Sequence, residues 1–245
     1  MRADYAAAVR ESVNVLIDHE FDIIPIDLDR IFEDLSRTIK KYSYSELAAK
    51  YDVTISFICD YFESDLGACA YLADREQYII VYNDTKFNYG LDRFTIAHEL
   101  GHFFLNHYAQ VESNVLLRKR MPERKYKKFE NEANCFARNL LAPVPLVERI
   151  IELDSPLSIQ ELQDAFNISY QAAKTRKGLF QADRYRMQTD YYTYFNGYEI
   201  NFGYYCVSCG NAEIEASNFC KICGEVASIF DKTHNRTFYE GFALD

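Results

Sequence analysis

The sequence of 245 residues has little of what several classes of protein require, beginning with positive charge. Its 27 lysines and arginines stand against 37 aspartates and glutamates, which gives a formal net charge of −10. This balance argues against a protein whose main role is to wrap nucleic acid, because such binding depends on neutralising phosphates. The first residues lack the apolar run of a secretory signal, and no stretch approaches the ~20 apolar residues of a membrane span. We therefore expect a cytoplasmic protein without a membrane partner.

Histidine is also scarce, yet two of the five histidines belong to one compact motif. Residues 98–102 are His-Glu-Leu-Gly-His in an apolar stretch, and residues four apart on a helix share a face. His98 and His102 are therefore predicted to bind one metal ion, with the spacing of a zinc site. Glu99 is predicted to be the catalytic general base, since it can contact a metal-bound water without being a ligand.

The zinc site predicted from this motif needs a further ligand. Catalytic zinc commonly takes two histidines and one carboxylate and leaves a fourth position for water. The next predicted helix, residues 127–141, offers Glu130 and Glu132, which lie about 200° apart, so only one can face the metal. Glu132 borders the predicted buried face more closely and is the predicted third ligand. That face consists of Phe129, Ala133, Phe136, Ala137 and Leu140.

The blocks RFTIAHELGHFFLNH and ENEANCFARNLLAP, in this order, resemble the ImmA/IrrE family of bacterial and bacteriophage metallopeptidases. The resemblance covers roughly residues 22–146. It implies a gluzincin-like fold with His98, His102 and Glu132 as zinc ligands and Glu99 as the base. It also implies a protein partner, a helix-turn-helix repressor of phage, mobile-element or stress genes, which members cleave or in some cases only bind.

Two positions depart from the patterns of other zinc peptidases. His107 suggests a third histidine ligand, but the metzincin pattern needs glycine at 105 and histidine at 108, where this chain has Leu105 and Tyr108. His107 is therefore expected to be structural. Thermolysin-like enzymes usually place an acid four residues after the glutamate ligand to orient a histidine, and counting from Glu132 gives Phe136. The partners of the ligands stay unassigned.

Basic residues concentrate in two places beyond the motif. Residues 114–128 carry seven bases and one acid, which indicates either a solvated connection or a surface that holds an acidic stretch of a substrate. Residues 158–179 are predicted to form a helix-turn-helix-like pair of helices with Ser158 and Ser169 as caps. Packing of this pair on the core is favoured over direct DNA binding, for which the candidates are Lys174, Arg176 and Lys177.

Four of the seven cysteines form two knuckles, each followed by glycine, namely Cys206-x-x-Cys209-Gly210 and Cys220-x-x-Cys223-Gly224. This pattern is typical of a four-cysteine zinc ribbon, since glycine permits the tight turn that brings backbone amides to the sulfurs. Disulfides are the competing interpretation, which a cytoplasmic location disfavours. We predict a second Zn²⁺ here, structural because protein ligands fill all four positions.

Local signals predict the remaining helices and strands. Asp4 and Asp27 are expected to cap two amphipathic helices, and residues 43–62 are expected to form two short helices, with Thr54 as a cap.

Strands are expected in three places. Residues 68–72 and 78–82 are predicted to form a hairpin whose second strand offers an edge to a substrate. The aromatic residues 191–205 are predicted to form a strand pair that turns at Asn196-Gly197.

Together these patterns predict an α+β protein in three parts. A zincin-like (gluzincin) metallopeptidase domain, mostly helical with a small sheet, spans residues 1–153. The helix-turn-helix-like segment spans residues 154–188 and packs on it, and an aromatic β segment with the zinc ribbon spans residues 189–245. The predicted function is that of a zinc-dependent endopeptidase that cleaves a helix-turn-helix repressor and so relieves transcriptional repression. The alternative is a regulator that binds a partner protein, or DNA, without proteolysis.

Overall fold

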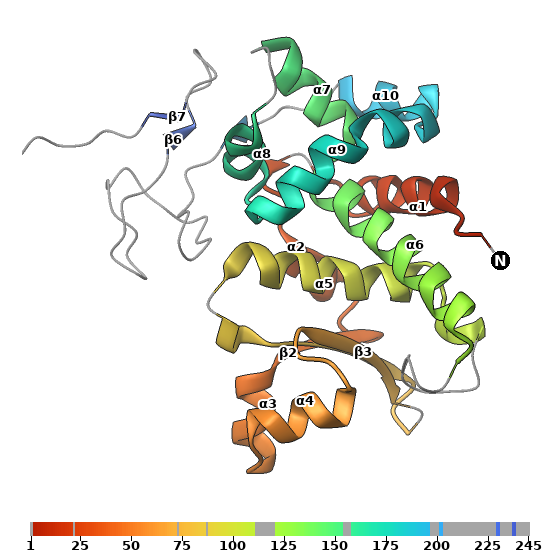
Figure 1. The fold of residues 1–245 in the computed structure, drawn as a ribbon, viewed down its shortest axis with the longest axis vertical. Helices are drawn as coiled ribbons and strands as arrows, with labels where there is room; N and C mark the ends of the chain where they lie inside the picture. The colour runs from red at the N-terminus through yellow and green to blue at the C-terminus, as the bar shows by residue number, and fades with distance from the viewer. Residues whose placement is uncertain are drawn as a thin grey trace, which may run out of the picture.

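The computed structural model describes residues 2–21, 23–72, 74–86, 88–110, 121–153, 158–196, 201–202, 229–230 and 237–238 (Figure 1). The helices are α1 (Tyr5–Asp18), α2 (Leu28–Asp34), α3 (Tyr44–Tyr51), α4 (Ile55–Phe62), α5 (Tyr89–Phe104), α6 (Glu123–Leu141), α7 (Val144–Leu153), α8 (Ile159–Phe166), α9 (Tyr170–Arg186) and α10 (Thr189–Asn196). The strands are β1 (Ile23–Ile24), β2 (Ile39–Ser43), β3 (Gly67–Leu72), β4 (Gln77–Tyr82), β5 (Asn201–Phe202), β6 (Ile229–Phe230) and β7 (Thr237–Phe238). This mostly helical structure with small sheets fits the predicted α+β class.

The three-stranded sheet separates two hydrophobic cores. Its order is β2-β4-β3, with β2 parallel and β3 antiparallel to β4. Helices α3 and α4 lie on one face and α5 lies on the other (Figure 1). Because successive side chains of a strand point to opposite faces, Ala68 and Val81 join the core with α3 and α4, while Cys69 and Ile80 join the core with α5. The sheet therefore supports α5 from below in this view.

Helices cover the side of α5 that faces away from the sheet. Helix α6 packs on α5, α1 packs on α6, and α9 contacts both α1 and α5 (Figure 1). Helices α7, α8 and α10 complete the outer layer. Consequently α5, which carries the metal-binding motif, is held between a sheet and a helical layer.

The predicted helix starts are confirmed at the level of individual hydrogen bonds. The Asp4 side chain accepts from the Ala7 N–H at the start of α1, and Asp27 caps α2. Thr54 caps α4, and Ser158 and Ser169 cap α8 and α9. Each cap satisfies a backbone N–H that has no partner within its helix, which is why these short polar residues mark the starts.

The predicted hairpin is also confirmed, but its role in the sheet differs from the prediction. Strands β3 and β4 pair with Ala70 opposite Ile79, close to the predicted bounds. Strand β2, which the sequence analysis did not identify, pairs with the other side of β4, with Lys41 opposite Ile80. The prediction that residues 78–82 offer a free edge is therefore wrong, because β4 is the central strand and β3 is an edge.

The aromatic segment after residue 188 begins as a helix and not as a strand. Tyr191, Tyr194 and Phe195 lie on one side of α10, because positions three and four apart share a helical face. Phe195 is buried, and the Tyr194 hydroxyl donates to the carbonyl oxygens of Leu16 and Phe21 at 3.1 and 2.9 Å. Packing against α1 thus overrides the strand preference of aromatic residues.

Two other findings concern the chain as a whole. Among the described residues, no helix combines the length and the apolar character needed to cross a bilayer. The four cysteines of the predicted ribbon, Cys206, Cys209, Cys220 and Cys223, lie outside the described residues.

A buried ionic network joins α9 to α6. Asp183 accepts hydrogen bonds from Arg138 Nε at 2.6 Å and Nη2 at 2.9 Å, and it also accepts from Asn139. Arg176 Nη1 lies 3.3 Å from the same carboxylate and donates to Asn139. Burial opposes ionisation of Asp183, but the Arg138 hydrogen bonds and the two guanidinium charges lower its pKa on balance. The carboxylate is therefore ionised and holds the two helices together.

Replacing Asp183 should destabilise the fold, because two buried guanidinium groups would lose their counter-charge. We expect Asp183→Ala to lower the free energy of unfolding by about 3–5 kcal/mol in urea denaturation. Since the folded-state pKa is below the ordinary value, the contribution of Asp183 is present at neutral pH and is lost as the pH falls through that lowered pKa. The exposed Asp74→Ala should change stability by no more than about 0.5 kcal/mol. Equal effects of the two variants would contradict this account.

Candidate metal centre

Helix α5 presents the three motif residues to one cleft. The Asn88 side chain caps the helix by accepting from the Leu91 N–H at 3.0 Å. His98 and His102 project from the same face one turn apart, and their Nε2 atoms lie 3.1 Å from each other. Both imidazoles are therefore already directed at one point, as the spacing of four predicts.

Helix α6 approaches α5 closely at Gly101. A Cβ atom placed on Gly101 would lie 3.1 Å from Ala133 Cα and 3.1 Å from Phe136 Cδ1. These distances are too short for an ordinary side-chain contact with a backbone atom, so glycine sets the separation of the two helices. The close approach brings side chains of α6 one turn earlier against the two histidines.

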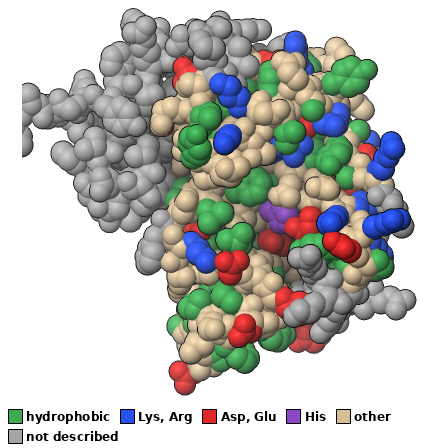
Figure 2. Space-filling model, in the orientation of Figure 1, with side chains coloured by type: hydrophobic (Ala, Val, Ile, Leu, Met, Phe, Trp, Pro, Cys, Tyr) green, Lys and Arg blue, Asp and Glu red, His purple; other side chains and the backbone are tan. Residues whose placement is uncertain are grey.

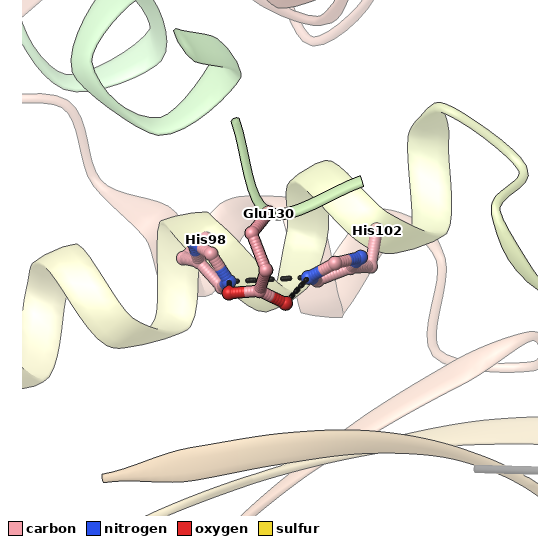
Figure 3. Close-up of side chains that lie close together, drawn as sticks. All are labelled: His98, His102 and Glu130. Atoms are coloured by element: carbon pink, nitrogen blue, oxygen red, sulfur yellow. Dashed lines mark hydrogen bonds and ion pairs between the residues drawn. The ribbon is translucent and has the colours of Figure 1, made fainter. Parts of the chain in front are cut away.

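Glu130 of α6 completes the site. Its Oε2 lies 3.4 Å from His98 Nε2 and its Oε1 lies 3.4 Å from His102 Nε2, so the carboxylate spans both rings (Figure 3). Ligand atoms about 2.0–2.1 Å from a tetrahedral zinc ion lie about 3.3 Å from one another. The two Nε2 atoms lie 3.1 Å apart, close to this spacing, and each faces a different Glu130 oxygen at 3.4 Å. One donor atom from each of the three side chains lies within 4.8 Å of the other two, and two imidazoles with a carboxylate are a donor set that zinc accepts. The residues present therefore fit a zinc ion.

The structure does not bring Glu132, the predicted third ligand, to the two histidines and brings Glu130 there in its place. Glu132 borders the buried face, as predicted, but it points away from the two Nε2 atoms toward His107 and Lys128. Glu130 keeps 30% of its side chain exposed, whereas Glu132 keeps 5%. Nearness to the buried face therefore does not identify the carboxylate that faces the cleft.

Asn134 of α6 is the partner of His98. His98 Nδ1 lies 3.1 Å from the Asn134 side-chain oxygen, which accepts the ring N–H when His98 binds metal through Nε2. Asn134 is four residues after Glu130, the spacing at which thermolysin-like enzymes place an acid. The same count from Glu132 reaches Phe136, whose side chain has no polar group that could orient a histidine. Here an uncharged amide orients His98.

His107 is the partner of the other histidine. It lies beyond the end of α5, and its Nδ1 is 2.9 Å from His102 Nδ1. Burial, with the charges of His102 and Lys128, lowers the pKa of His107 to about 2. The His107 ring is therefore neutral, and its contact with Glu132 is a hydrogen bond to a carboxylate and not an ion pair. The expectation that His107 is structural, and not a ligand, agrees with its position.

The ionisation states around the ligands follow from burial and from their mutual contacts. Burial raises the pKa of Glu130, but the contacts with His102 and His98 outweigh it and hold that pKa well below its ordinary value. Burial lowers the pKa of His98, and the Glu130 hydrogen bond raises it on balance. Glu130 is therefore the anion of the site.

Glu99 lies at the same site without belonging to the metal-binding group. It is buried, and it lines the cleft with both histidines and Glu130. Burial raises the pKa of Glu99, while the charges of His98 and His102 oppose the rise. A carboxyl group with a raised pKa suits transfer of a proton, which is the role predicted for Glu99.

The cleft at this site has a volume of about 400 Å³. Its walls come from β3, α5 and α6, and include Gly67 to Cys69 of the strand and Tyr126 of α6. In the space-filling view the histidine and acidic side chains lie at the bottom of a hollow between the sheet layer and the helical layer (Figure 2). An edge strand therefore runs along the predicted catalytic residues.

The three candidates for DNA contact differ in exposure, since Lys174 and Lys177 are exposed and Arg176 is not. Arg176 has no exposed surface, and its guanidinium is directed at Asp183, Asn139 and the Ala142 carbonyl. A phosphate contact by the exposed Lys174 would therefore be made without the charge of Arg176. Arg176, one of the candidates for the disfavoured DNA contact, is therefore not available to a phosphate, and its charge serves the α6–α9 junction.

Replacing the third ligand should remove the metal without removing the fold. Glu130→Gln keeps the shape of the side chain but lacks the anion, so we expect the zinc content, measured by mass spectrometry of the native protein, to fall by one ion per chain. Glu123→Gln, an exposed carboxylate in the first turn of the same helix, should keep the full zinc content. Full zinc content in Glu130→Gln would contradict the assignment.

The comparisons with known proteins agree with this geometry. Residues 60–176 match the Peptidase_M78 family, described as the IrrE N-terminal-like domain. No curated protein sequence matches the chain significantly. The matched region contains β3, β4, α5 and α6, and so it holds every residue of the metal centre. This match supports the similarity of the chain to the ImmA/IrrE metallopeptidases.

Proposed function

We propose that the chain is a zinc-dependent endopeptidase. The observation that carries the proposal is the convergence of His98, His102 and Glu130 beside the buried Glu99, in a cleft bordered by an edge strand. A metal site that only stabilised the fold would need neither a general base nor a cleft. The similarity of residues 60–176 to a peptidase family supports the same activity.

The residues of the cleft divide the chemistry among them. His98, His102 and Glu130 would hold the zinc ion, which when bound lowers the pKa of a water molecule and polarises a carbonyl group. Glu99 would accept the proton of the attacking water on a carboxylate oxygen and then pass it to the departing amine. Asn134 and His107 keep the two imidazoles oriented, so that both Nε2 atoms stay directed at the ion.

Strand β3 is the proposed binding edge for an extended substrate. It is an edge of its sheet, and Gly67, Ala68 and Cys69 line the cleft beside His98 and Glu99. A peptide added to this edge would be held by main-chain hydrogen bonds, which do not depend on its sequence. This arrangement replaces the predicted use of residues 78–82.

A basic hollow near the cleft favours an acidic substrate segment. A groove of about 580 Å³ shares Phe94 and Asn134 with the catalytic cleft, and the basic hollow, of about 640 Å³, shares Tyr5 and Asn131 with that groove. The basic side chains of the hollow are Arg2, Arg124, Lys127 and Lys128. Lysines and arginines gather on this side of the histidine in Figure 2. The proposed substrate is a helix-turn-helix repressor, on the basis of the family resemblance, and we propose that an acidic stretch of it occupies this hollow.

Removing the proposed base should abolish cleavage and nothing else. Glu99→Gln should keep its zinc and its thermal unfolding midpoint, but it should cut no peptide bond when mixed with the repressor encoded by a neighbouring gene. Intact mass spectrometry of the mixture would show fragments with the natural protein only. If both proteins relieve repression equally and neither yields a fragment, the chain acts by binding its partner and the endopeptidase proposal fails.

Charge reversal in the basic hollow should weaken recognition of an acidic substrate. We expect Arg124→Glu with Lys127→Glu to lower kcat/KM several-fold, with a larger loss at low salt, because exposed charges are screened by ions. Lys174→Glu, an exposed base on α9 outside the hollow, is the matched control. An unchanged kcat/KM for a peptide that carries the acidic stretch would remove the hollow from the substrate site.

A further inference from the structure

Glu132, the carboxylate that does not reach the metal centre, contacts it through His107. His107 Nδ1 lies 2.9 Å from His102 Nδ1, and His107 Nε2 lies 3.2 Å from Glu132 Oε2. His107 keeps 1% of its side chain exposed and Glu132 keeps 5%. A buried chain of three side chains therefore runs from a metal ligand to a carboxylate on the opposite side of α6.

The position of His107 is fixed by the chain itself. Asn106 has a left-handed φ of 51°, which turns the backbone after α5, and the His107 N–H then donates to the His102 carbonyl at 3.1 Å. The His107 ring stacks on Phe129 with centroids 4.2 Å apart and planes 14° apart. Backbone and ring contacts thus hold the imidazole between its two partners.

Only one arrangement of ring protons satisfies the series His102, His107 and Glu132. If His102 binds metal through Nε2, its proton is on Nδ1 and is donated to His107 Nδ1, which must therefore be unprotonated. The His107 proton is then on Nε2 and is donated to Glu132 Oε2. Glu132 as an anion accepts it, and it also accepts from Lys128 Nζ at 3.0 Å and from the Asp4 N–H at 2.6 Å. Every donor in the series then has an acceptor.

We propose that His107 and Glu132 are positioning residues of the metal centre. They fix the tautomer and orientation of His102 by a hydrogen-bonded relay that ends on Lys128 and on the backbone N–H of Asp4, the N-cap of α1. The proposal rests on the zinc site proposed above. It gives the two ligand histidines unequal supports, an uncharged amide for His98 and a charged carboxylate, acting through a second imidazole, for His102. A carboxylate in this position makes the ligand imidazole a stronger donor to the metal.

Two variants of one residue test the relay. Glu132→Ala removes the acceptor of the His107 proton, so we expect zinc binding, measured by competition with a chelator, to weaken about 10- to 100-fold. Long-range ¹H–¹⁵N spectra of the histidine rings should then show that His107 no longer keeps a single tautomer. Glu132→Gln retains a side-chain oxygen that can accept, so it should keep the tautomers and lose less zinc affinity. Glu123→Ala, on the exposed side of α6, should match the natural protein in both measurements.

The outcomes separate the relay from a structural role and from the proposed enzyme activity. Unchanged zinc affinity in both Glu132 variants, or weaker binding in Glu132→Ala with unchanged tautomers, would overturn the proposal. If Glu132→Ala does not fold, weaker zinc binding by folded Glu132→Gln supports the relay, and natural affinity overturns it. A natural protein that binds zinc tightly but cuts no substrate would contradict the endopeptidase and leave the relay standing. A natural protein that binds no zinc at this site would contradict both.

Discussion

The close approach of α5 and α6 at Gly101 is the constraint on which the metal centre depends. The two histidines lie next to each other because they belong to one helix. The carboxylate belongs to another helix, so its position depends on how the two helices pack. With Ala133 Cα 3.1 Å from the position of an added Cβ, the two backbones would have to move apart to accept a side chain at Gly101. The sheet beneath α5 and the α1 and α9 helices above α6 hold this crossing in place. The scaffold therefore determines the site through one interhelical distance.

What the sequence could predict is what depends on neighbours in the chain. The caps at Asp4, Thr54 and Ser169 follow from hydrogen bonds within three residues, and they were predicted correctly. The convergence of His98 and His102 follows from the helical repeat alone. The choice between Glu130 and Glu132 depends instead on the rotation of α6 about its axis, which is set by contacts with distant segments. The pattern of buried positions identifies the side of α6 that faces the core, whereas Glu130 faces the cleft.

Charge and hydrophobicity patterns failed where a residue met an unexpected partner. Arg176 belongs to a basic run that resembles a solvated face, yet Asp183, seven residues later, and Asn139 of α6 enclose it. The aromatic run after residue 188 has strand preferences, yet Tyr194 and Phe195 form part of a helical face against α1. In both cases one partner, Asn139 for Arg176 and Leu16 for Tyr194, is distant in sequence. Such contacts depend on the tertiary structure and cannot be predicted from the local composition.

Glu130 and Glu132 of α6 have different roles because their surroundings differ. Glu130 is partly open to the cleft, so it can exchange solvent for a metal ion, and its charge is balanced by the two imidazoles that it spans. Glu132 is closed off, and its charge is balanced by Lys128 and by the backbone N–H of Asp4. Exchanging their roles would require α6 to rotate by about half a turn about its own axis. A spacing of two residues on a single helix therefore places Glu130 at His102 Nε2 and Glu132 behind His107, which contacts the Nδ1 atom of the same His102 ring.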